Sequence, residues 1–587
     1  MPRLLRTLVP TPGGKILENS EVAKVLFEIA DYLEIQGVSF KPQAYRRAAG
    51  AIESLDRSIE DYHRTNSLRD IPGIGEAIAE KISELISTGK LGYLEKLKAE
   101  MPPGILELLE IPDIGPKKAM MLTKQLGVKS IEDLKAAIFD HRLQGLKGFG
   151  AKTEERILQG IRVVESRGGR SLLGTAYEAA EHIIALLEEK HPDARLSMAG
   201  SLRRMKETIG DIDILAASES PVELMGTFVS LKGVESVLAK GETKSSVRLS
   251  EGMQVDLRVI LPKDWGAALQ YFTGSKEHNV ELRKLAISKG MKISEYGLFE
   301  RDSGKEIATA SEEEIYAKLG LQFIPPELRE SRGEIAAASR NAIPEVIGYG
   351  DLRGDLHCHT EWSDGSGTIE DVWRKAKALG YEYVAIADHS RSLKVANGLS
   401  EDRLLEQIAA VRKARERLGP PWLLASCEVD LLGDGRLDYP RKVLDELDYA
   451  VMSVHTKFKM DEKAMTDRII SGMANDKVRV FAHPTGRLIG QRASYTYDFD
   501  KVTQAAKDHG ISLEINSFPE RLDLNDLNVR RAIEAGARIS IDSDAHSPDQ
   551  MEFVRYGIAT ARRGWAKRSD IVNAMSLTDL RKEWGVQ

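Results

Sequence analysis

The spacing of hydrophobic positions changes along the chain, and each change predicts a different kind of structure. Residues 20–165 carry apolar side chains at helical spacing, as in SEVAKVLFEIADYLEI, where Ser20 is the expected N-cap. Glycine-containing turns separate these helices, and residues 171–191 form a further amphipathic helix. From about residue 195 the spacing becomes strand-like, in RLSMAGS, DIDILAAS, SVRLS and MQVDLRVIL. A helical and mixed segment follows to about residue 324.

A polar segment with several prolines, 324–355, predicts a connector with one short helix before the pattern changes again. Beyond it, apolar strands alternate with helices, for example in YEYVAIAD, YAVMSVH and ISLEINS. Such alternation predicts a parallel α/β barrel or sheet. The chain therefore has a helical end, a mixed middle and a parallel α/β end.

Composition bounds the class of protein. The 587 residues suffice for several domains, and 42% hydrophobic with 29% charged residues is typical of a globular protein. Two cysteines exclude a disulfide-stapled secreted scaffold and favour a reducing cytosol. No run reaches the ~18 apolar residues of a membrane span, and the N-terminus lacks the apolar core of a signal peptide. We therefore expect a cytoplasmic protein without a membrane partner. The net charge of −7 by itself argues against nucleic acid.

Three short loops at the helical end share one form. IPGIG (71–75), IPDIG (111–115) and LKGFG (146–150) each precede a helix with a nearby lysine. Glycine allows close backbone approach, and N–H groups at a helix start bind anions. One such loop would equally suit a helix C-cap, but three copies favour phosphate binding. Asp113 replaces the first glycine of the second loop, and the third lies in a basic stretch, 141–170, with seven Lys/Arg against three Glu.

The loops resemble the helix-hairpin-helix, a sequence-independent clamp on the DNA backbone. The candidate DNA-contacting residues are Lys41, Tyr45, Gly73, Gly75, Gly115, Gly148, Gly150 and Lys152. Lys81 lies about one and a half helical turns beyond the first loop. It is either a solvated surface lysine or a Schiff-base nucleophile, and the second role requires a lowered pKa from burial or neighbouring cations.

The segment AGSLRRMKETIGDIDILAAS (199–218) predicts a nucleotidyl-transfer site. Gly-Ser opens a turn or helix start whose N–H groups can hold a triphosphate, and Arg204 would neutralise its charge. Asp211 and Asp213 are two positions apart on a strand, so their carboxylates share one face. Asp256 supplies a third carboxylate from another strand. Three converging carboxylates predict a site for two Mg²⁺ ions, one beside the attacking hydroxyl and one beside the triphosphate.

Histidines concentrate at the C-terminal end, with seven of the 12 after residue 350. The candidate metal ligands are His357, His359, Asp364, His389, Glu428, His455, His483, Asp544 and His546. Nearly all lie where a strand runs into a loop, the rim on which α/β-barrel active sites form. His-x-His and Asp-x-His pairs place ligands on one face. We interpret Cys358 and Cys427 as buried apolar residues and His509 as a surface residue, and we expect Asp388 to orient the neighbouring His389.

Residues 195–299 resemble the palm and thumb of family X DNA polymerases, the family of DNA polymerase beta, and the resemblance extends back to about residue 20. It implies that Asp211 and Asp213 ligate both metals and that Asp256 assists the nucleophile. The nucleotide-binding residues that it implies are Gly200, Ser201, Arg204, Tyr271, Phe272, Gly274, Lys276, Asn279 and Arg283. Lys81 falls on the lysine that cleaves deoxyribose phosphate in some members, while Ala77 replaces a second lysine of the best-known member.

Residues 351–575 resemble the PHP domain, the polymerase and histidinol phosphatase family of phosphoesterases. The resemblance implies up to three clustered divalent metals, held by the nine candidate ligands in a seven-stranded distorted barrel. Mixed imidazole and carboxylate ligands suit Mn²⁺, Zn²⁺ or Fe²⁺. Such a cluster would activate water and stabilise the leaving oxygen of a phosphodiester or phosphomonoester.

The expected fold is multidomain α/β, in the order of bacterial family X polymerases that carry a C-terminal PHP domain. The expected domains are a helix-hairpin-helix domain like the family's 8-kDa domain (1–95), a fingers region with further DNA-binding helix-hairpin-helix loops (96–170), a DNA polymerase beta-like nucleotidyltransferase palm (171–260), a thumb (261–324), a linker (325–350) and a PHP distorted (β/α)7 barrel (351–587).

The resemblance implies a monomeric, nucleoid-associated enzyme of the bacterial cytoplasm that fills short gaps during base excision repair. Its substrates would be dNTPs and gapped or nicked DNA with a 5′-phosphate, and its polymerase cofactor Mg²⁺ or Mn²⁺. The PHP domain would act as a 3′–5′ exonuclease, with AP-endonuclease or 3′-phosphatase activity as further options. Two alternatives stay open: a PHP nuclease on a degenerate DNA-binding polymerase scaffold, and a phosphoesterase resembling histidinol phosphatase. The intact carboxylate triad argues against the first, and the helix-hairpin-helix loops argue against the second.

Overall fold

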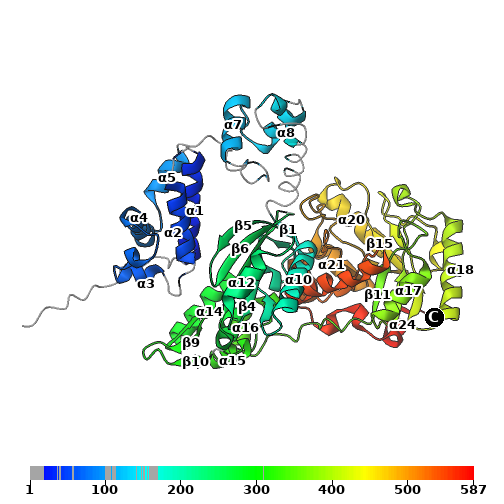
Figure 1. The fold of residues 1–587 in the computed structure, drawn as a ribbon. Helices are drawn as coiled ribbons and strands as arrows, with labels where there is room; N and C mark the ends of the chain where they lie inside the picture. The colour runs from blue at the N-terminus through cyan, green and yellow to red at the C-terminus, as the bar shows by residue number, and fades with distance from the viewer. Residues whose placement is uncertain are drawn as a thin grey trace, which may run out of the picture. The chain divides into compact units, whose positions relative to one another are not determined.

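The computed structural model, drawn in Figure 1, describes most of the chain after residue 18. The described residues are 19–35, 38, 41–53, 55, 59–99, 108, 111, 114, 116–139, 142–146, 149, 153–154, 157, 161, 170–250, 252–308 and 310–586. The chain divides into two compact units: Met1–Gly169 with Ser220–Val259, and Arg170–Glu219 with Ile260–Gln587.

Short helices build the N-terminal part of the first unit, as the apolar spacing predicts. These helices are α1 (Asn19–Ile35), α2 (Lys41–Glu53), α3 (Ile59–Arg64), η1 (Leu68–Asp70), α4 (Glu76–Thr88), α5 (Gly92–Ala99), α7 (Pro116–Leu126), α8 (Ile131–Phe139) and η2 (Arg142–Gly145). In α4, Ile78, Ile82 and Leu85 recur at helical spacing and are buried. Gly75 is its N-cap, and Gly89 ends it in the left-handed conformation, with φ of 70°. None of the described helices combines the length and the apolar character that a membrane span requires.

The first unit also contains a helix and an antiparallel strand meander. Its elements are α12 (Pro221–Val229), β5 (Val234–Lys240), β6 (Lys244–Leu249) and β7 (Gln254–Ile260), whose last residue belongs to the second unit. In β7, Val255, Leu257 and Val259 are buried, and the intervening Asp256 and Arg258 point to the other, less buried face. The sequence pattern does not predict β5 because most of its side chains are exposed and show no apolar alternation.

The second unit begins with a helix packed on a strand pair. Its first elements are β1 (Ser171–Leu172), α10 (Leu173–Lys190), β2 (Arg195–Met198), α11 (Gly200–Arg203), β3 (Thr208–Ile209) and β4 (Ile212–Ala217). β2 and β4 pair antiparallel, with Met198 opposite Ile214, and β1 pairs with β3. The predicted amphipathic helix over 171–191 is confirmed by α10, and the Gly-Ser turn opens the short helix α11.

A mixed segment follows. It comprises η3 (Pro262–Asp264), α13 (Trp265–Thr273), α14 (Lys276–Ser288), β8 (Met291–Ser294), β9 (Gly297–Glu300), β10 (Glu306–Ala308), α15 (Glu312–Lys318), η4 (Pro326–Leu328) and α16 (Glu334–Ala338). The three strands form an antiparallel sheet in the order β10-β9-β8. Its buried core includes Leu282, Ile315 and Tyr316. The predicted connector contains the single α-helix α16, preceded by the 3₁₀ turn η4.

Parallel strands and helices alternate through the rest of the second unit. The strands are β11 (Gly354–Cys358), β12 (Tyr383–Ile386), β13 (Trp422–Ala425), β14 (Glu428–Asp430), β15 (Ala450–Ser453), β16 (Val478–Phe481), β17 (Ser512–Asn516) and β18 (Arg538–Asp542). The helices are α17 (Ile369–Ala378), η5 (Lys394–Ala396), α18 (Glu401–Leu418), α19 (Arg441–Leu444), α20 (Glu462–Met473), α21 (Phe499–His509), α22 (Asp526–Glu534), η6 (Pro548–Phe553), α23 (Val554–Arg563), η7 (Arg568–Asp570), η8 (Val572–Ala574) and α24 (Leu577–Trp584).

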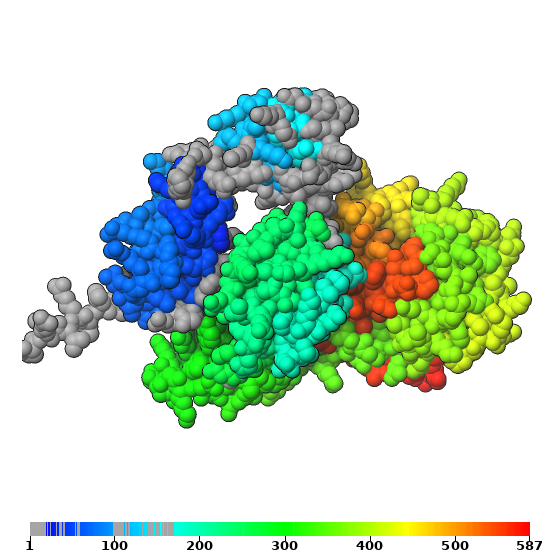
Figure 2. All heavy atoms as spheres, viewed as in Figure 1, coloured from blue at the N-terminus to red at the C-terminus, as the bar shows by residue number. Residues whose placement is uncertain are grey.

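These strands close into a barrel. Strands β11-β12-β13 form one parallel sheet and β14 to β18 another. Only two residues separate β13 from β14, so the two are segments of one bent strand, which leaves the seven strand positions that the resemblance to the PHP domain implies. The bridges His389↔Glu428 and Cys358↔Ala545 join the two sheets at both seams. Figure 2 shows the residues of this barrel as one continuous body.

Candidate active sites

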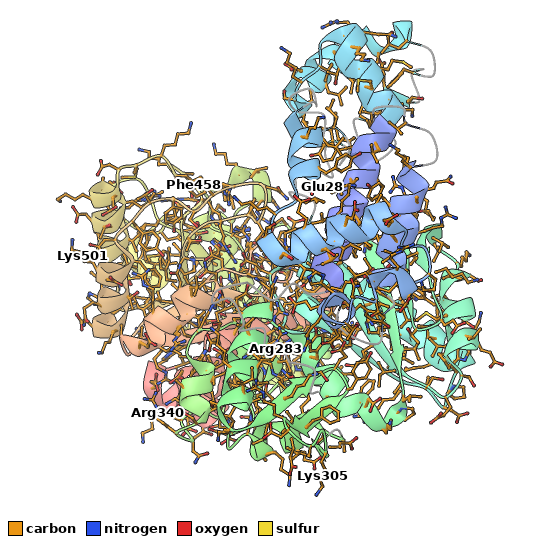
Figure 3. The ribbon with its side chains drawn as sticks, turned by 90° about the vertical axis from the view of Figure 1, so that its left-hand side faces the viewer. Glu28, Arg283, Lys305, Arg340, Phe458 and Lys501 are labelled. Carbon is orange, nitrogen blue, oxygen red and sulfur yellow. The ribbon has the colours of Figure 1, made fainter. Side chains whose placement is uncertain are left out.

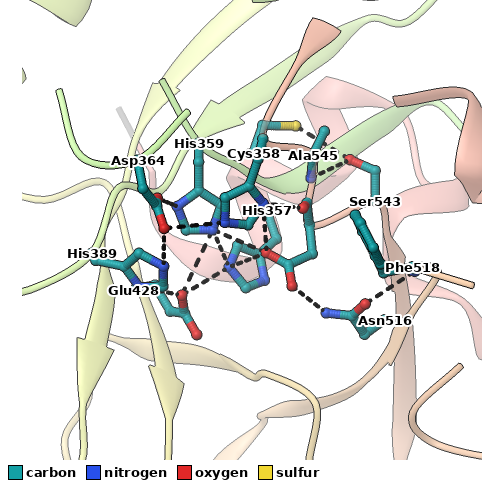
Figure 4. A network of polar contacts seen from close by, with 12 residues as sticks. His357, Cys358, His359, Asp364, His389, Glu428, Asn516, Phe518, Ser543 and Ala545 are labelled. Carbon is teal, nitrogen blue, oxygen red and sulfur yellow. Dashed lines mark hydrogen bonds and ion pairs between the residues drawn. The ribbon is translucent and has the colours of Figure 1, made fainter. Parts of the chain in front are cut away.

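The barrel strands deliver the predicted metal ligands to one rim. His357 lies near the end of β11 and Glu428 begins β14. The other histidines and Asp544 follow the ends of β11, β12, β15, β16 and β18 within four residues. Because the strands are parallel, their carboxyl ends meet at one side of the barrel. Figure 4 shows the rings of His357, His359 and His389 turned toward the carboxylates at this rim.

One group of candidate ligands surrounds Asp364. It consists of His359, Asp364, His389 and His546, whose ligand atoms all lie within 4.8 Å of one another. Asp364 Oδ2 lies 3.5 Å from His389 Nε2 and 3.5 Å from His546 Nε2. Asp364 Oδ1 lies 3.9 Å from His359 Nδ1. Four donors are therefore close enough to share one ion.

Two further groups overlap with the first. His357, His359 and Asp544 form one of them: the two Nε2 atoms are 3.1 Å apart, and His359 Nε2 is 3.0 Å from Asp544 Oδ1. His389, Glu428 and His455 form the other. Because His359 and His389 each belong to two groups, the three sets adjoin.

Glu428 is the central carboxylate of the third group. Its Oε2 lies 2.7 Å from His389 Nδ1, and its Oε1 lies 3.4 Å from His455 Nε2. His483 Nε2 approaches the same Oε1 at 2.9 Å. The side chain of Glu428 is fully buried. All nine predicted ligands are therefore brought together.

The chemistry of these side chains fits divalent metal ions. His359 Nδ1 is buried and has no hydrogen-bond partner among the described residues. The imidazole of His357 contacts Glu514 Oε1 through Nδ1 at 2.7 Å. In a neutral ring that donates from Nδ1, Nε2 is an acceptor, and here Nε2 points toward His359 and Asp544. Buried imidazole and carboxylate donors of this kind suit Mn²⁺, Zn²⁺ or Fe²⁺.

Several carboxylates and amides orient the ligands, and our reading of the sequence did not identify them. Glu514 contacts His357 Nδ1 and accepts from the backbone N–H of His483 at 2.6 Å. Asp430 Oδ1 lies 2.7 Å from His455 Nδ1, and Asn516 Nδ2 donates to Asp544 Oδ2 at 2.8 Å. A charged residue in the middle of the apolar strand ISLEINS was the available signal for Glu514.

Asp388 acts differently from the prediction. Its carboxylate accepts from the backbone N–H of Thr360 at 2.8 Å and from its hydroxyl at 2.6 Å, and from the hydroxyl of Ser363 at 2.5 Å. Asp388 thus fixes the loop that carries Asp364, instead of orienting the ring of its neighbour His389. The reason is geometric, because the buried Asp388 side chain points toward the loop that follows β11.

The other sequence interpretations of this region agree with the structure. Cys358 and Cys427 are buried free cysteines and belong to none of the candidate metal groups. Burial raises the pKa of both thiols well above its usual range, which disfavours thiolate ligands. His509 is exposed at the end of α21.

Burial and neighbouring charges shift the pKa values of these side chains. Burial by itself would lower the pKa of His389, but Glu428 and Asp364 outweigh it and raise that pKa to about 10. Burial lowers the pKa of His359 to about 3, and the neighbouring His389 and His546 act in the same direction. Burial raises the pKa of Glu514 to about 7 despite its contact with His357. The mixture of buried carboxylates and imidazole rings therefore shifts the pKa values at this rim in both directions.

The candidate nucleotidyl-transfer residues are distributed over both units. Asp211 directly precedes β4 and is exposed, and Asp213 lies two positions on and is half-buried, while Ile212 and Ile214 between and after them are buried. The two carboxylates therefore share the face predicted for them. A Cβ on Gly200 would lie 2.0 Å from Asp213 Oδ2, so only glycine fits beside this aspartate.

Asp256 lies in β7 of the first unit. Its Oδ2 is 3.3 Å from Lys244 Nζ, and its Oδ1 accepts from Gln254 Nε2 at 2.8 Å. β6 and β7 hold Asp256 opposite Ser246 in the antiparallel register.

The predicted nucleotide contacts cluster at the end of α13, in the turn that follows it and at the start of α14. Tyr271 and Phe272 stack edge-to-face with ring centroids 5.1 Å apart. Gly274 follows α13 with φ of 69°, and Lys276 begins α14. Asn279 is buried and donates from Nδ2 to the backbone carbonyl of Tyr271 at 2.7 Å.

Arg283 (Figure 3) lies one turn farther along α14 and donates from Nε to the carbonyl of Asn279 at 3.3 Å. Ser201 and Arg204 lie in and just after α11. Arg204 Nη1 donates to the backbone carbonyl of Thr273 at 2.6 Å, which links α11 to the turn at Gly274. These contacts bring the Gly-Ser helix and the start of α14 together.

The helical end contains part of the predicted DNA-contacting set. Gly73 has φ of 89° in the first loop, and Gly75 caps α4. Lys41 is exposed at the start of α2, whereas Tyr45 is buried, and burial raises its pKa to about 12. Lys81 is half-buried, where Nζ donates to the carbonyl of Ala77 at 3.1 Å and lies 4.8 Å from the ring centroid of Tyr93. Four further residues, Gly115, Gly148, Gly150 and Lys152, fall outside the described residues.

The fold and the two sets of candidate metal ligands are those expected of a polymerase of the DNA polymerase beta type joined to a PHP phosphoesterase barrel. Family comparisons match residues 17–91 to a helix-hairpin-helix domain, 105–162 to a SAM-like helix-hairpin-helix tandem, 268–330 to the DNA polymerase beta thumb and 355–517 to the PHP domain. Both the polymerase and the PHP families are metal-dependent.

Curated relatives agree with this class. The DNA polymerase/3′–5′ exonuclease PolX of Bacillus subtilis (strain 168) is 38% identical over 567 residues, which cover 96% of this chain and 99% of that protein. DNA polymerase lambda of Rattus norvegicus is 26% identical over 343 residues, or 53% of this chain and 56% of that protein. DNA polymerase lambda of Arabidopsis thaliana is 27% identical over 345 residues, or 53% and 62%. The chain belongs to the family X DNA polymerases that carry a PHP domain.

Proposed function

We propose that this chain is a DNA-directed DNA polymerase with a metal-dependent 3′–5′ exonuclease, and that it fills short gaps during base excision repair. The observation that carries the proposal is the pairing of two ligand sets on one chain. One is the Gly-Ser helix beside Asp211 and Asp213, and the other is the nine-residue rim of the barrel. Similarity to the Bacillus subtilis protein over nearly the whole chain supports both activities.

At the polymerase centre, Asp211, Asp213 and Asp256 would hold Mg²⁺ or Mn²⁺. When bound, such ions would supply charge stabilisation for the attacking 3′-hydroxyl and for the triphosphate. The N–H groups at the start of α11, with Ser201 and Arg204, would bind the triphosphate of the incoming dNTP. Tyr271 and Phe272 would pack along its sugar, while Lys276, Asn279 and Arg283 would lie toward the base and the template.

At the exonuclease centre, the nine rim residues would hold up to three ions of Mn²⁺, Zn²⁺ or Fe²⁺. When bound, such ions would supply an activated water and charge stabilisation for the leaving oxygen of a phosphoester. The chain itself sets the geometry: Glu514 and Asp430 fix the rings of His357 and His455 from behind, so that each Nε2 faces the centre. AP-site cleavage and 3′-phosphate removal are included in the proposal because both break phosphoester bonds.

The helical end would grip gapped or nicked DNA through its 5′-phosphate. The exposed Lys41 and the backbone at Gly73 and Gly75 support this role. Lys81 is proposed as the lyase nucleophile because it falls on the lysine that cleaves deoxyribose phosphate in some members of the family. We further propose that the enzyme is a monomer in the bacterial cytoplasm, associated with the nucleoid.

A single assay tests both centres. A 5′-phosphorylated gapped duplex is incubated with Mg²⁺ or Mn²⁺, with and without dNTPs, and both extension and shortening of the 3′ end are measured. We expect gap filling with dNTPs and Mn²⁺-dependent shortening without them. Replacing His357 and His359 by alanine should abolish shortening and leave extension intact. Shortening without any extension would support a nuclease on a degenerate scaffold, and hydrolysis of histidinol phosphate alone would support a small-molecule phosphoesterase.

A further inference from the structure

Arg563, the last residue of α23, connects the barrel to Arg204, the residue that follows α11 and is proposed to bind the triphosphate. Its side chain is 4% exposed. Nε and Nη2 donate to Asp526 Oδ2 of the barrel helix α22, at 3.0 and 2.8 Å. Nη1 donates to Glu330 Oε1 at 3.0 Å and to the backbone carbonyl of Arg204 at 2.6 Å. One buried guanidinium therefore contacts the barrel, the segment after η4 and the residue that follows α11.

The side chain of Arg204 is held by the same carboxylate. Its Nε donates to Glu330 Oε1 at 3.0 Å, and its Nη1 donates to the carbonyl of Thr273 at 2.6 Å. A Cβ on Gly274 would lie 3.2 Å from Arg204 Nη1, so the guanidinium packs against the turn before α14. Arg563 thus touches both the backbone of Arg204 and the acid that orients its side chain.

The balance of charge in this network determines how much positive charge Arg204 can offer. Arg332 also donates to Asp526 Oδ2, at 2.9 Å, so three guanidinium groups share two carboxylates. Glu330 paired with Arg204 alone would cancel the charge that a triphosphate requires. Because Arg563 shares the same oxygen of Glu330, part of the charge of Arg204 stays available, and burial keeps this interaction poorly screened. Burial would raise the pKa of Glu330, but Arg563 and Arg204 outweigh it and lower that pKa, so Glu330 is ionised at neutral pH.

We propose that Arg563 is a positioning residue for nucleotide incorporation, which acts through Glu330 and the Arg204 carbonyl to set the place and the effective charge of the Arg204 guanidinium. This inference rests on the proposed role of Arg204 in binding the triphosphate. The PHP domain then has a second role, separate from its metal chemistry: it completes the nucleotide site of the polymerase. The effect belongs to dNTP binding and not to the chemical step.

The test measures the KM for dNTP and kcat in single-nucleotide gap filling by the full chain. Arg563→Met should raise KM about tenfold, the size of one charge-assisted hydrogen bond, and change kcat less than about threefold. Arg563→Lys keeps the charge and should raise KM less. Adding Glu330→Gln to Arg563→Met removes the carboxylate that would otherwise cancel Arg204, and should return KM to within about threefold of the parent value. A merely structural role for Arg563 predicts no such rescue.

Arg562→Met is the matched control. Arg562 is the preceding residue of the same helix and binds Glu327 Oε1 at 2.7 Å and the Ile347 carbonyl at 2.7 Å, without a contact to Arg204 among the described residues. Its KM should match the parent protein, and the exonuclease rate of every variant reports on folding of the barrel. The inference is overturned by an unchanged KM in Arg563→Met, by an equal rise in Arg562→Met, or by absence of rescue in the double variant.

Two further arms keep the result decisive. If Arg563→Met does not yield folded protein, Arg563→Lys replaces it, and an unchanged KM in that variant overturns the inference. Arg204→Met tests the proposed function on its own. If KM rises in Arg204→Met but not in Arg563→Met, only the positioning role fails. If KM is unchanged in Arg204→Met, the proposed nucleotide role of Arg204 fails.

Discussion

The barrel rim and the paired aspartates before and within β4 use related ligand chemistry in opposite surroundings. Glu428 and His357 are fully buried, and carboxylates such as Glu514 hold the rings from behind. Asp211 is exposed and Asp213 half-buried. The difference predicts a preorganised metal centre in the barrel and a more exposed one beside β4.

The largest expected effect concerns the paired aspartates, Asp211 and Asp213. Changing Asp211 and Asp213 together to Asn removes two negative charges and keeps side-chain volume. Nucleotide incorporation should fall about 1,000-fold, because the lost metal ligands supply several kcal/mol of charge stabilisation. Primer extension on a gapped duplex measures the loss, and the exonuclease rate of the same sample should not change. Extension at a normal rate would refute the assignment of these aspartates.

Ion pairs hold the buried charge of Glu312 in the polymerase part of the second unit, through Arg203 and Arg329. Burial would raise the pKa of Glu312, but Arg329 and Arg203 outweigh it and lower that pKa from 4.5 to about 2. Such a shift corresponds to about 3 kcal/mol of stability. Because the folded-state pKa is depressed, this stability is fully present above about pH 4.5 and is lost as the pH falls toward 2.

Glu312→Gln should therefore lower stability by about 3 kcal/mol at pH 7, since it leaves the buried Arg329 without a charged partner. The difference from the parent protein should shrink as the pH falls below 4.5. Calorimetric unfolding of both proteins at pH 7, 5 and 3.5 measures it. A difference that is constant with pH would contradict the ion-pair explanation.

The orienting contacts of the barrel give the next largest effect. Glu514→Gln keeps the shape of the side chain but replaces the carboxylate behind His357. Loss of such an orienting partner typically lowers metal affinity or activity 10–100-fold, and we expect about that loss in Mn²⁺-dependent exonuclease activity. Extra Mn²⁺ should restore part of the rate if affinity is the cause. Gap filling serves as the internal control, and an unaltered Mn²⁺ requirement would show that Glu514 does not tune the ligands.

Chelation compares the two centres directly. Ligands that are buried and oriented should release their ions about tenfold more slowly than exposed aspartates. After brief EDTA treatment and gel filtration, the protein should still contain metal and retain exonuclease activity, while extension should require added Mg²⁺. Metal content per chain is measured by elemental analysis, with His357→Ala/His359→Ala as the control that should contain none of the retained metal. Equal loss of metal from the parent and from this variant would remove the distinction between the two centres.

Sequence patterning predicted the barrel rim because the signal is local. Most candidate ligands lie at or just after the end of a strand, and strand alternation places His357 and His359 on one face. The same reasoning did not predict that the segment around Glu330 forms a buried network of charged side chains. Its prolines and polar residues predict a connector with one short helix and no buried charge network, yet Arg329 is fully buried. The partners of Glu330 lie 126 and 233 residues away in sequence, so no local pattern contains them. Glu514 was not predicted for a related reason. Its role depends on the contact with His357, which lies 157 residues away in sequence.

The smallest expected effect concerns Cys358, which strand alternation turns away from the face shared by His357 and His359. Cys358 lies between two metal-ligand candidates, is fully buried, and places Sγ 3.6 Å from Ser543 Oγ. Cys358→Ala should leave exonuclease activity and metal content within about twofold and lower stability by about 1 kcal/mol, because the change removes only a small buried group. Elemental analysis and thermal unfolding measure the two quantities. Loss of an ion in this variant would make the thiol a ligand. Unchanged metal content, set beside the loss expected in His357→Ala/His359→Ala, would confine ligation to the strand face that the histidines share.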